Sequence, residues 1–133
     1  MQFTHDHMIF TLMSMYPHLS HWTHYKVAHP TNAAGEQIGD PWIVEWTAED
    51  AKPPFDWIMD HFEQHRDEIC AALARYYRDE RLRFSDQFAY LPPDATDAVR
   101  EKNKQWLEYR AALRDIPSQE GFPHDIVWPT PPL

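Results

Sequence analysis

Apolar residues recur at steps of three and four along 53–84, which is the spacing of one face of an α-helix. Pro53 and Pro54 suit the first turn of such a helix, and Asp56, Asp60 and Glu63 suit its positive end. One step of seven residues interrupts an otherwise regular series: Phe55, Ile58, Met59, Phe62, Ile69, Leu73 and Tyr76. The pattern predicts that this stretch is the longest helix of the chain.

A second helix is predicted after the loop Ser85–Asp94, with Asp94 or Thr96 as its N-cap and an end near Ile116. Pro117 cannot continue it. Its spacing of 3, 4, 3, 4, 3 indicates a seam for an antiparallel helix or for another chain, made of Val99, Lys102, Trp106, Tyr109, Leu113 and Ile116.

The N-terminal part of the chain predicts a short helix and two strands. Apolar positions within Asp6–Met15 fit a helix that Pro17 ends. The segments Trp22–His29 and Pro41–Thr47 are rich in aromatic and β-branched residues. We therefore expect a β-hairpin with one face against a helix and with an exposed, mobile loop at Thr31–Asp40.

The C-terminal segment is rich in proline, which favours an extended chain. It contains Gly121 and Trp128 together with Pro123, Pro129, Pro131 and Pro132. A catalytic loop, a docking peptide and a C-terminal brace are three alternatives. Ile126 and Trp128 alternate along the segment, so one side of it can face the helices. This alternation favours the brace.

Together these elements predict an α+β fold: a short N-terminal helix, a β-hairpin, and a long two-helix antiparallel hairpin with an extended Pro/Trp tail. We expect one compact chain over residues 1–133. Residues 1–52 would form the first helix and the β-hairpin, and residues 53–133 the two-helix hairpin and the tail.

Charge and composition narrow the classes of function. The 133 residues carry 21 Asp or Glu against 12 Lys or Arg, a formal charge of −9, which argues against nucleic-acid binding and against anionic membranes. No apolar run is long enough to cross a bilayer, and no signal peptide is recognisable. The simplest interpretation is cytoplasmic synthesis without export. Nine histidines make solubility and association sensitive to pH near 6.

The histidines and the single cysteine are the candidates for chemistry. His61 and His65 share a helix face, but Phe62 stands where the H-E-x-x-H motif has its glutamate. His18, His21 and His24 are regularly spaced and straddle a predicted strand. Cys70 lies between apolar residues in the middle of a helix, as a core cysteine does. We expect no catalytic residue, no cofactor and no metal site.

Six tryptophans are spread over every predicted element. A domain of this size cannot easily bury all six while pairing each indole N–H, so some should mark a contact surface. The alternative is that all six belong to one core.

The segment Arg78–Pro132 resembles the phage tail assembly chaperone family. Members carry an R-D-x-L-L-x-x-S-D-W segment, then W-x-x-Y-R-x-x-L-R-D-I-P and a closing G-F-P…W-P-x-x-P. Gln87–Phe88 departs from this pattern, because the family more often has Trp directly after the Asp. The matching residues are Asp79, Leu82, Ser85, Asp86, Trp106, Tyr109, Arg110, Leu113, Arg114, Asp115, Ile116, Pro117, Gly121, Phe122, Pro123, Trp128 and Pro129.

The N-terminal part is similar, more loosely, to small proteins encoded in phage tail gene clusters. The matching residues are Tyr16, Pro17, Tyr25, Val27, Ile43 or Val44, and Trp46. The two resemblances imply a chaperone-like module from about residue 75 and a non-enzymatic role in assembling a tail or tail fibre.

Client binding or docking of the tail would then fall to the aromatic residues and to two arginines. The partner would be a phage tail or tail-fibre protein, with a second copy of this chain as a further partner, in the cytoplasm of the host cell. The rival hypothesis is a structural component of the virion tail, baseplate or fibre. The candidate residues are Trp106, Tyr109, Arg110, Arg114, Phe122, Trp128, Trp42 and Trp46.

Overall fold

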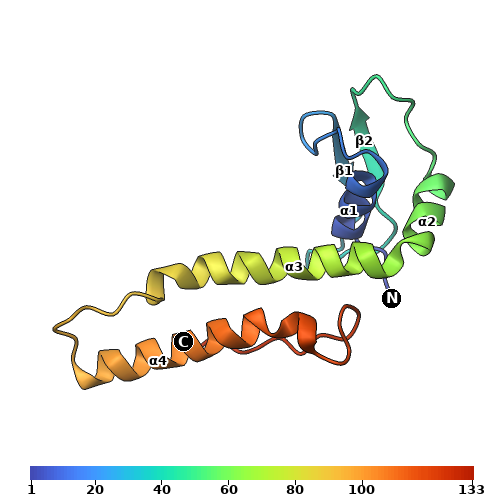
Figure 1. Ribbon diagram of the computed structural model, residues 1–133. Coiled ribbons are helices and arrows are strands. Elements are labelled where there is room, and N and C mark those ends of the chain that lie inside the picture. The colour runs from blue at the N-terminus through green and yellow to red at the C-terminus, as the bar shows by residue number, and fades with distance from the viewer. The chain divides into compact units, whose positions relative to one another are not determined.

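The computed structural model describes residues 1–133, which form four α-helices, two short 3₁₀ helices and one two-stranded antiparallel sheet (Figure 1). This confirms the predicted α+β class. The chain divides into two compact units, Met1–Leu73 and Ala74–Leu133. Each unit has its own apolar core, and each is described by itself below.

Helix α1 (His5–Met15) opens the first unit and begins with a capping box. The Thr4 side chain accepts a hydrogen bond from the His7 backbone N–H, and His7 Nδ1 accepts one from the Thr4 backbone N–H at 3.1 Å. Histidine takes the place of the usual Glu or Gln here, so the cap requires His7 Nδ1 to be unprotonated. The helix ends at Tyr16, directly before Pro17, as predicted.

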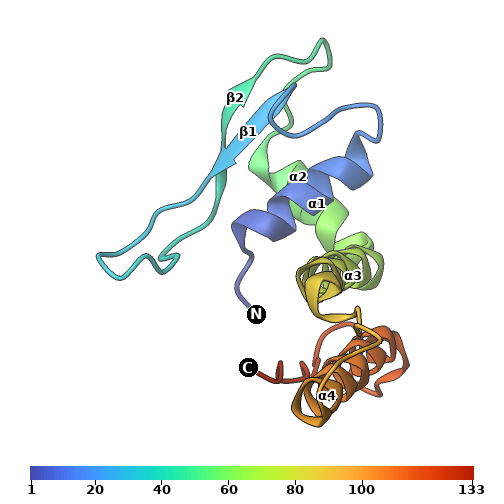
Figure 2. The same cartoon turned by 90° about the vertical axis from the view of Figure 1, so that its left-hand side faces the viewer.

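The predicted β-hairpin is present, formed by β1 (Tyr25–Ala28) and β2 (Trp42–Trp46) with a bulge between Lys26 and Val27. Tyr25 and Ile43 turn inward and join Met8, Leu12 and Phe62 in the core of the first unit. The hairpin thus has one face on the helices, beside α1 and α2 (Figure 2). Trp42 and Val44 of β2 are exposed.

The hairpin loop is exposed, as expected, but it is more ordered by hydrogen bonds than a freely mobile loop. Asn32 Oδ1 accepts the backbone N–H groups of Ala34 and Glu36, and Gly35 adopts a positive φ of 81° that favours glycine. The Gln37 side chain donates to the Phe3 carbonyl and accepts from the His5 N–H. The loop is therefore tied to the start of the chain.

The helix predicted over 53–84 is two helices, α2 (Phe55–Gln64) and α3 (Arg66–Ser85). The prediction of one continuous helix is wrong at His65, whose φ of −121° and ψ of 26° leave the helical region. Its N–H is shared between the carbonyls of His61 and Phe62. The step of seven residues from Phe62 to Ile69 spans this break, so the irregular step marked the boundary.

The second unit consists of α3 from Ala74 onward, η1 (Asp86–Phe88), α4 (Asp97–Arg114), η2 (Ile116–Ser118) and the extended C-terminal segment. Thr96 caps α4, one of the two predicted N-caps. The helices of this unit lie side by side and antiparallel (Figure 1). Its core contains Trp106, Tyr109, Leu113 and Ile116, packed against Leu82 and Phe88.

The predicted seam of α4 is right in its second half and wrong in its first. Val99 and Lys102 are exposed, and Asn103 is buried in their place. Asn103 is buried because its side chain donates to two backbone carbonyls of the segment that precedes α4. The spacing of apolar residues cannot predict a buried polar contact of this kind.

Burial disfavours the charged form of three histidines in the first unit. Burial lowers the pKa of His7, His21 and His61. His5 Nε2, His21 Nε2 and His29 Nδ1 are buried without a hydrogen-bond partner, and the rings of His5 and His29 are 5.0 Å apart between centroids.

We expect the protein to be less stable in mild acid than near neutral pH. A lowered pKa in the folded state means that the unfolded chain binds the proton more tightly, so this stability is complete above the ordinary histidine value of about 6.5 and is lost as pH falls through the folded pKa. The melting temperature should therefore be lower at pH 5 than at pH 7.5.

The variant His7→Gln keeps the acceptor of the capping box but does not titrate. Its melting temperature should fall less between pH 7.5 and pH 5 than that of the unaltered chain. The part of the fall that remains comes from His21 and His61. An equal fall in both proteins would contradict the role given to His7.

Candidate functional site

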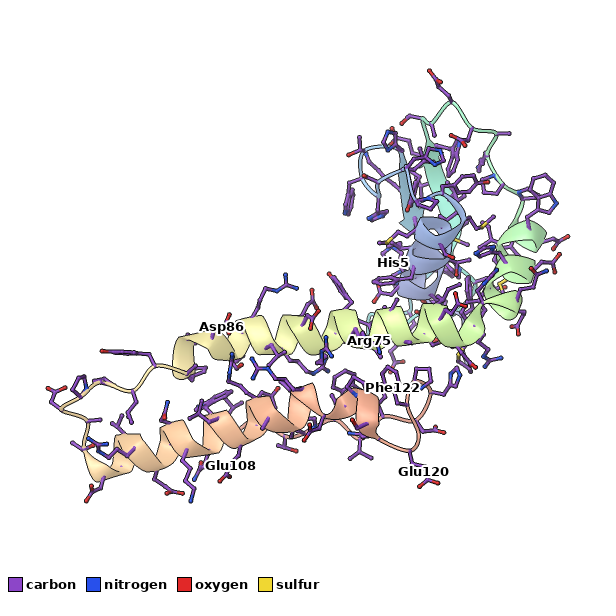
Figure 3. All side chains as sticks on the ribbon, in the orientation of Figure 1. His5, Arg75, Asp86, Glu108, Glu120 and Phe122 are labelled. Atoms are coloured by element: carbon purple, nitrogen blue, oxygen red, sulfur yellow. The ribbon has the colours of Figure 1, made fainter.

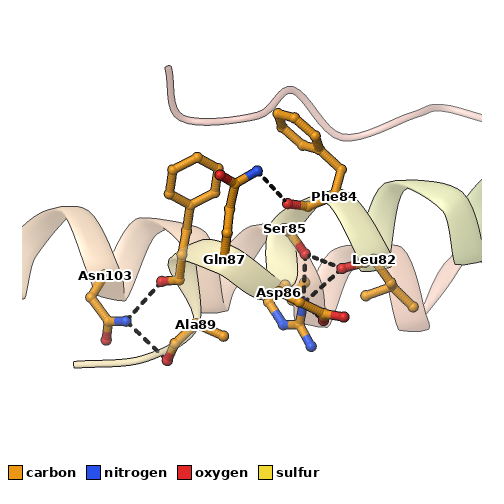
Figure 4. A network of polar contacts seen from close by, with 9 residues as sticks. Leu82, Phe84, Ser85, Asp86, Gln87, Ala89 and Asn103 are labelled. Atoms are coloured by element: carbon orange, nitrogen blue, oxygen red, sulfur yellow. Dashed lines mark hydrogen bonds and ion pairs between the residues drawn. The ribbon is translucent and has the colours of Figure 1, made fainter.

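A network of polar contacts joins α4 to the end of α3 (Figure 4). Arg110 of α4 makes three of these contacts. Arg110 Nη1 lies 2.9 Å from the Leu82 carbonyl oxygen, 2.6 Å from Ser85 Oγ and 2.8 Å from Asp86 Oδ1. The last carbonyls of a helix have no partner within it and carry partial negative charge. The two N–H bonds of Nη1 are therefore shared among a carbonyl, a hydroxyl and a carboxylate, all within hydrogen-bond distance.

The second polar contact of the network lies at η1. Asn103 Nδ2 donates to the carbonyls of Phe88 and Ala89 at 3.1 and 3.2 Å (Figure 4). Ser85, fully buried, donates to the Leu82 carbonyl at 2.8 Å. The backbone that leaves α3 is therefore fixed by side chains from α4 on both sides of η1.

Aromatic stacking supports the same junction from the apolar side. The rings of Phe88 and Trp106 lie parallel, 4.2 Å apart between centroids, and Tyr109 meets Trp106 edge to face at 5.6 Å. Gln87 stands where the family pattern more often has Trp. Gln87 instead donates to the Phe84 carbonyl.

The extended segment 126–133, which we call the strap, lies on the two helices of the second unit. The guanidinium carbon of Arg81 lies 4.1 Å from the ring centroid of Trp128, a close cation–π contact. Further along, Lys102 Nζ donates to the Pro132 carbonyl. Ile126 and Trp128 pack on the core while Val127 is 77 % exposed, which is the predicted alternation.

The turn between Gln119 and Val127 reverses the chain and brings the strap back to the helices of the second unit. The Gln119 amide donates to the Val127 carbonyl and accepts the Val127 N–H, both at 2.9 Å. Arg75 faces Phe122 across the turn, with 5.2 Å from its guanidinium carbon to the ring centroid (Figure 3). A Cβ on Gly121 would lie 2.2 Å from the Asp125 carbonyl oxygen, so close approach, and not a positive φ, requires glycine here.

The structure gathers five of the eight predicted site residues around the strap and the polar network: Trp106, Tyr109, Arg110, Phe122 and Trp128. Trp106 and Tyr109 are buried, and Phe122 and Trp128 are partly buried. Arg114 is exposed, one turn beyond Arg110 on α4. The part each plays in client binding stays a prediction.

Trp42 and Trp46 belong to the first unit. Trp46 stacks on Tyr25 at 5.7 Å and donates to the Asp50 carbonyl at 2.7 Å, so it has a structural role. Trp42 is 48 % exposed. Sequence reasoning did not single out Arg81, Asn103 or Gln119, because each acts through a contact that depends on how the chain folds back.

The histidine pair and the cysteine considered for chemistry pack against other side chains of the first unit. The rings of His61 and His65 are 4.4 Å apart, and His61 Nε2 lies 2.8 Å from Ser14 Oγ. Burial raises the pKa of the Cys70 thiol, which disfavours the reactive thiolate. No three His, Cys, Asp or Glu side chains are arranged to hold a metal ion. No helix is both long enough and apolar enough to span a membrane.

Trp128→Ala should destabilise the protein, because it removes a partly buried ring and its cation–π partner. We expect a loss of about 1–2 kcal/mol. For a domain of this size the melting temperature should fall by several degrees, at roughly 2–8 °C per kcal/mol. Val127→Ala is the matched control and should change little, since Val127 faces solvent. Equal melting temperatures for all three proteins would show that the strap is not a brace.

Arg110→Ala should cost about 1–3 kcal/mol, because buried acceptors at the end of α3 lose a charged donor. Arg114→Ala, on the same helix but exposed, should stay within about 0.5 kcal/mol of the unaltered protein. Urea unfolding at neutral pH compares the two. A larger loss in Arg114→Ala than in Arg110→Ala would contradict the importance of the network.

Comparison with known families divides the chain close to the boundary between its units. Residues 71–133 match the family model of the phage tail assembly chaperone protein, and residues 8–69 match that of the XkdW protein. No curated protein and no solved structure matches the chain.

Proposed function

We propose that this chain, whose residues 71–133 match the family model of the phage tail assembly chaperone protein, binds a phage tail or tail-fibre protein through an aromatic surface and assists its folding or oligomerisation. The family is a non-enzymatic kind of protein. An assembly chaperone of this type would act in the cytoplasm of the infected host. Its partner, in this proposal, is a protein of the same phage tail.

The observation that carries the proposal is a set of aromatic rings left in solvent beside the junction of α3 and α4. Phe84 is 56 % exposed and Tyr90 is 74 % exposed. Phe84 is 5.9 Å from Phe88 and 6.5 Å from Trp106 between ring centroids, so an exposed ring continues the buried stack. Aromatic side chains on a rigid support are the residues that most often dominate binding energy at protein interfaces.

The buried site residues contribute to binding by holding that surface in place. Arg110 and Asn103 fix the backbone on either side of η1, and Trp106 supports the ring of Phe88. A surface fixed before binding costs less conformational entropy when the partner docks. Phe84 and Tyr90 are therefore the residues that we expect to touch the client, and Trp106 is a support.

Capture of a client tests the proposal. The full chain, carrying an affinity tag, is co-expressed with each tail protein of the same phage, and one of these proteins should co-purify. The double variant Phe84→Ser/Tyr90→Ser should lose most of it, while Val99→Ser, which removes another exposed apolar residue of the same unit, should retain it. Equal capture by both variants would remove the aromatic surface from the proposal.

Composition of the virion distinguishes the chaperone from the structural alternative. A chaperone is needed for infectious tails but is absent from purified particles. Detection of this chain in purified particles at a fixed ratio to the tail proteins would instead show a structural component of the tail, baseplate or fibre.

A further inference from the structure

The net negative charge of the protein lies almost entirely in its first unit. Residues 1–73 contain eleven Asp or Glu against three Lys or Arg, a formal charge of −8, whereas residues 74–133 contain ten against nine, a charge of −1. A field of one sign over a small unit attracts partners of the opposite sign and repels those of the same sign. The first unit is therefore suited to a positively charged partner.

The same unit has an apolar hollow of about 290 Å³. Met8, Ile43 and Ile58 of the core line it, and Trp42, Pro54 and Phe55 lie where it meets solvent. Trp42 is 48 % exposed and Phe55 is 38 % exposed, although the core beside them is closed to water. The hollow lies at the small end of the range for ligand pockets, and so it fits one or two apolar side chains of a protein segment.

Carboxylates that have no ion-pair partner adjoin the hollow in sequence. Asp40 comes two residues before Trp42. Asp56 directly follows Phe55 on α2, and Asp60 lies one turn further along the same helix. All three are exposed. Lys52 also lines the hollow, so it is the one cation among these acids. The three acids close to its lining residues in sequence outnumber this one cation.

We propose that this hollow docks an apolar side chain of a positively charged segment of a partner protein. Trp42 and Phe55 would contact the apolar side chain, and Asp40, Asp56 and Asp60 would attract the basic residues beside it. The inference rests on the proposed function for the kind of partner, a protein, and adds a second docking place in the first unit together with the chemistry that it selects.

Two peptides test it on the full chain by isothermal titration calorimetry. Both have the core Leu-Phe-Leu, which one peptide flanks with three lysines on each side and the other with three glutamates. The lysine peptide should bind at least tenfold more tightly than the glutamate peptide. Its affinity should fall as salt rises from 50 to 500 mM, because the attraction is screened.

Variants locate the binding. Trp42→Ala and Phe55→Ala should each weaken binding of the lysine peptide by about tenfold, a typical cost for truncating a central aromatic residue. Val44→Ala, an exposed residue of the same strand that does not line the hollow, should leave the affinity unchanged. Asp56→Asn/Asp60→Asn should narrow the difference between the two peptides without affecting the core of the unit.

Equal affinity for the two peptides, binding of neither, or equal effects of Val44→Ala and Trp42→Ala would each overturn the inference. Sedimentation that shows a dimer abolished by Trp42→Ala, with no peptide bound, would assign the hollow to a second copy and overturn it too. Selective peptide binding by a chain that captures no tail protein would overturn the proposed function and leave the hollow standing.

Discussion

The guanidinium of Arg110 lies at the end of α3. By bonding to Leu82, Ser85 and Asp86 it fixes the exit of α3 against the C-terminal part of α4. The rest of the second unit is built on that junction. The stack of Phe88 on Trp106 needs η1 in one position, and Ile126 and Trp128 of the strap pack against the same apolar cluster. A charged donor at a helix end thus sets the geometry in which the apolar contacts form.

The two units solve the problem of a small core in different ways. The first packs a hairpin of two short strands, which would be marginal alone, on α1, α2 and the start of α3. The second unit packs two α-helical segments together, and the extended strap covers part of their apolar core with Ile126 and Trp128. Proline holds the strap extended before it docks, so covering this core costs little conformational entropy. The aromatic residues are divided accordingly: some close the cores and others remain in solvent.

The sequence predicted the elements well because helices and strands are periodic. It predicted the fold class, the hairpin, Thr96 as one of two candidate N-caps, and the alternation of Ile126 and Trp128. It failed where one polar residue overrides the period, as at His65, which ends α2, and at Asn103, which is buried for its hydrogen bonds. The cation–π partner of Trp128 could not be predicted either, since Arg81 lies 47 positions earlier and meets the ring only after the chain folds back. Resemblance to a family singled out residues of the second unit that the structure brings together, and it left open whether each is a support or a contact.

The amide of Gln119 holds the strap with one donor and one acceptor, in the way a neighbouring strand would. The turn therefore depends on the Gln119 side chain remaining an amide. Deamidation, the slow hydrolysis of an amide to a carboxylate, would replace the donor that faces the Val127 carbonyl with a second acceptor. Two oxygens would then repel each other where a hydrogen bond had been, and the turn that returns the strap would loosen. Deamidation of Gln119 alone would therefore weaken the packing of Ile126 and Trp128 on the core of the second unit.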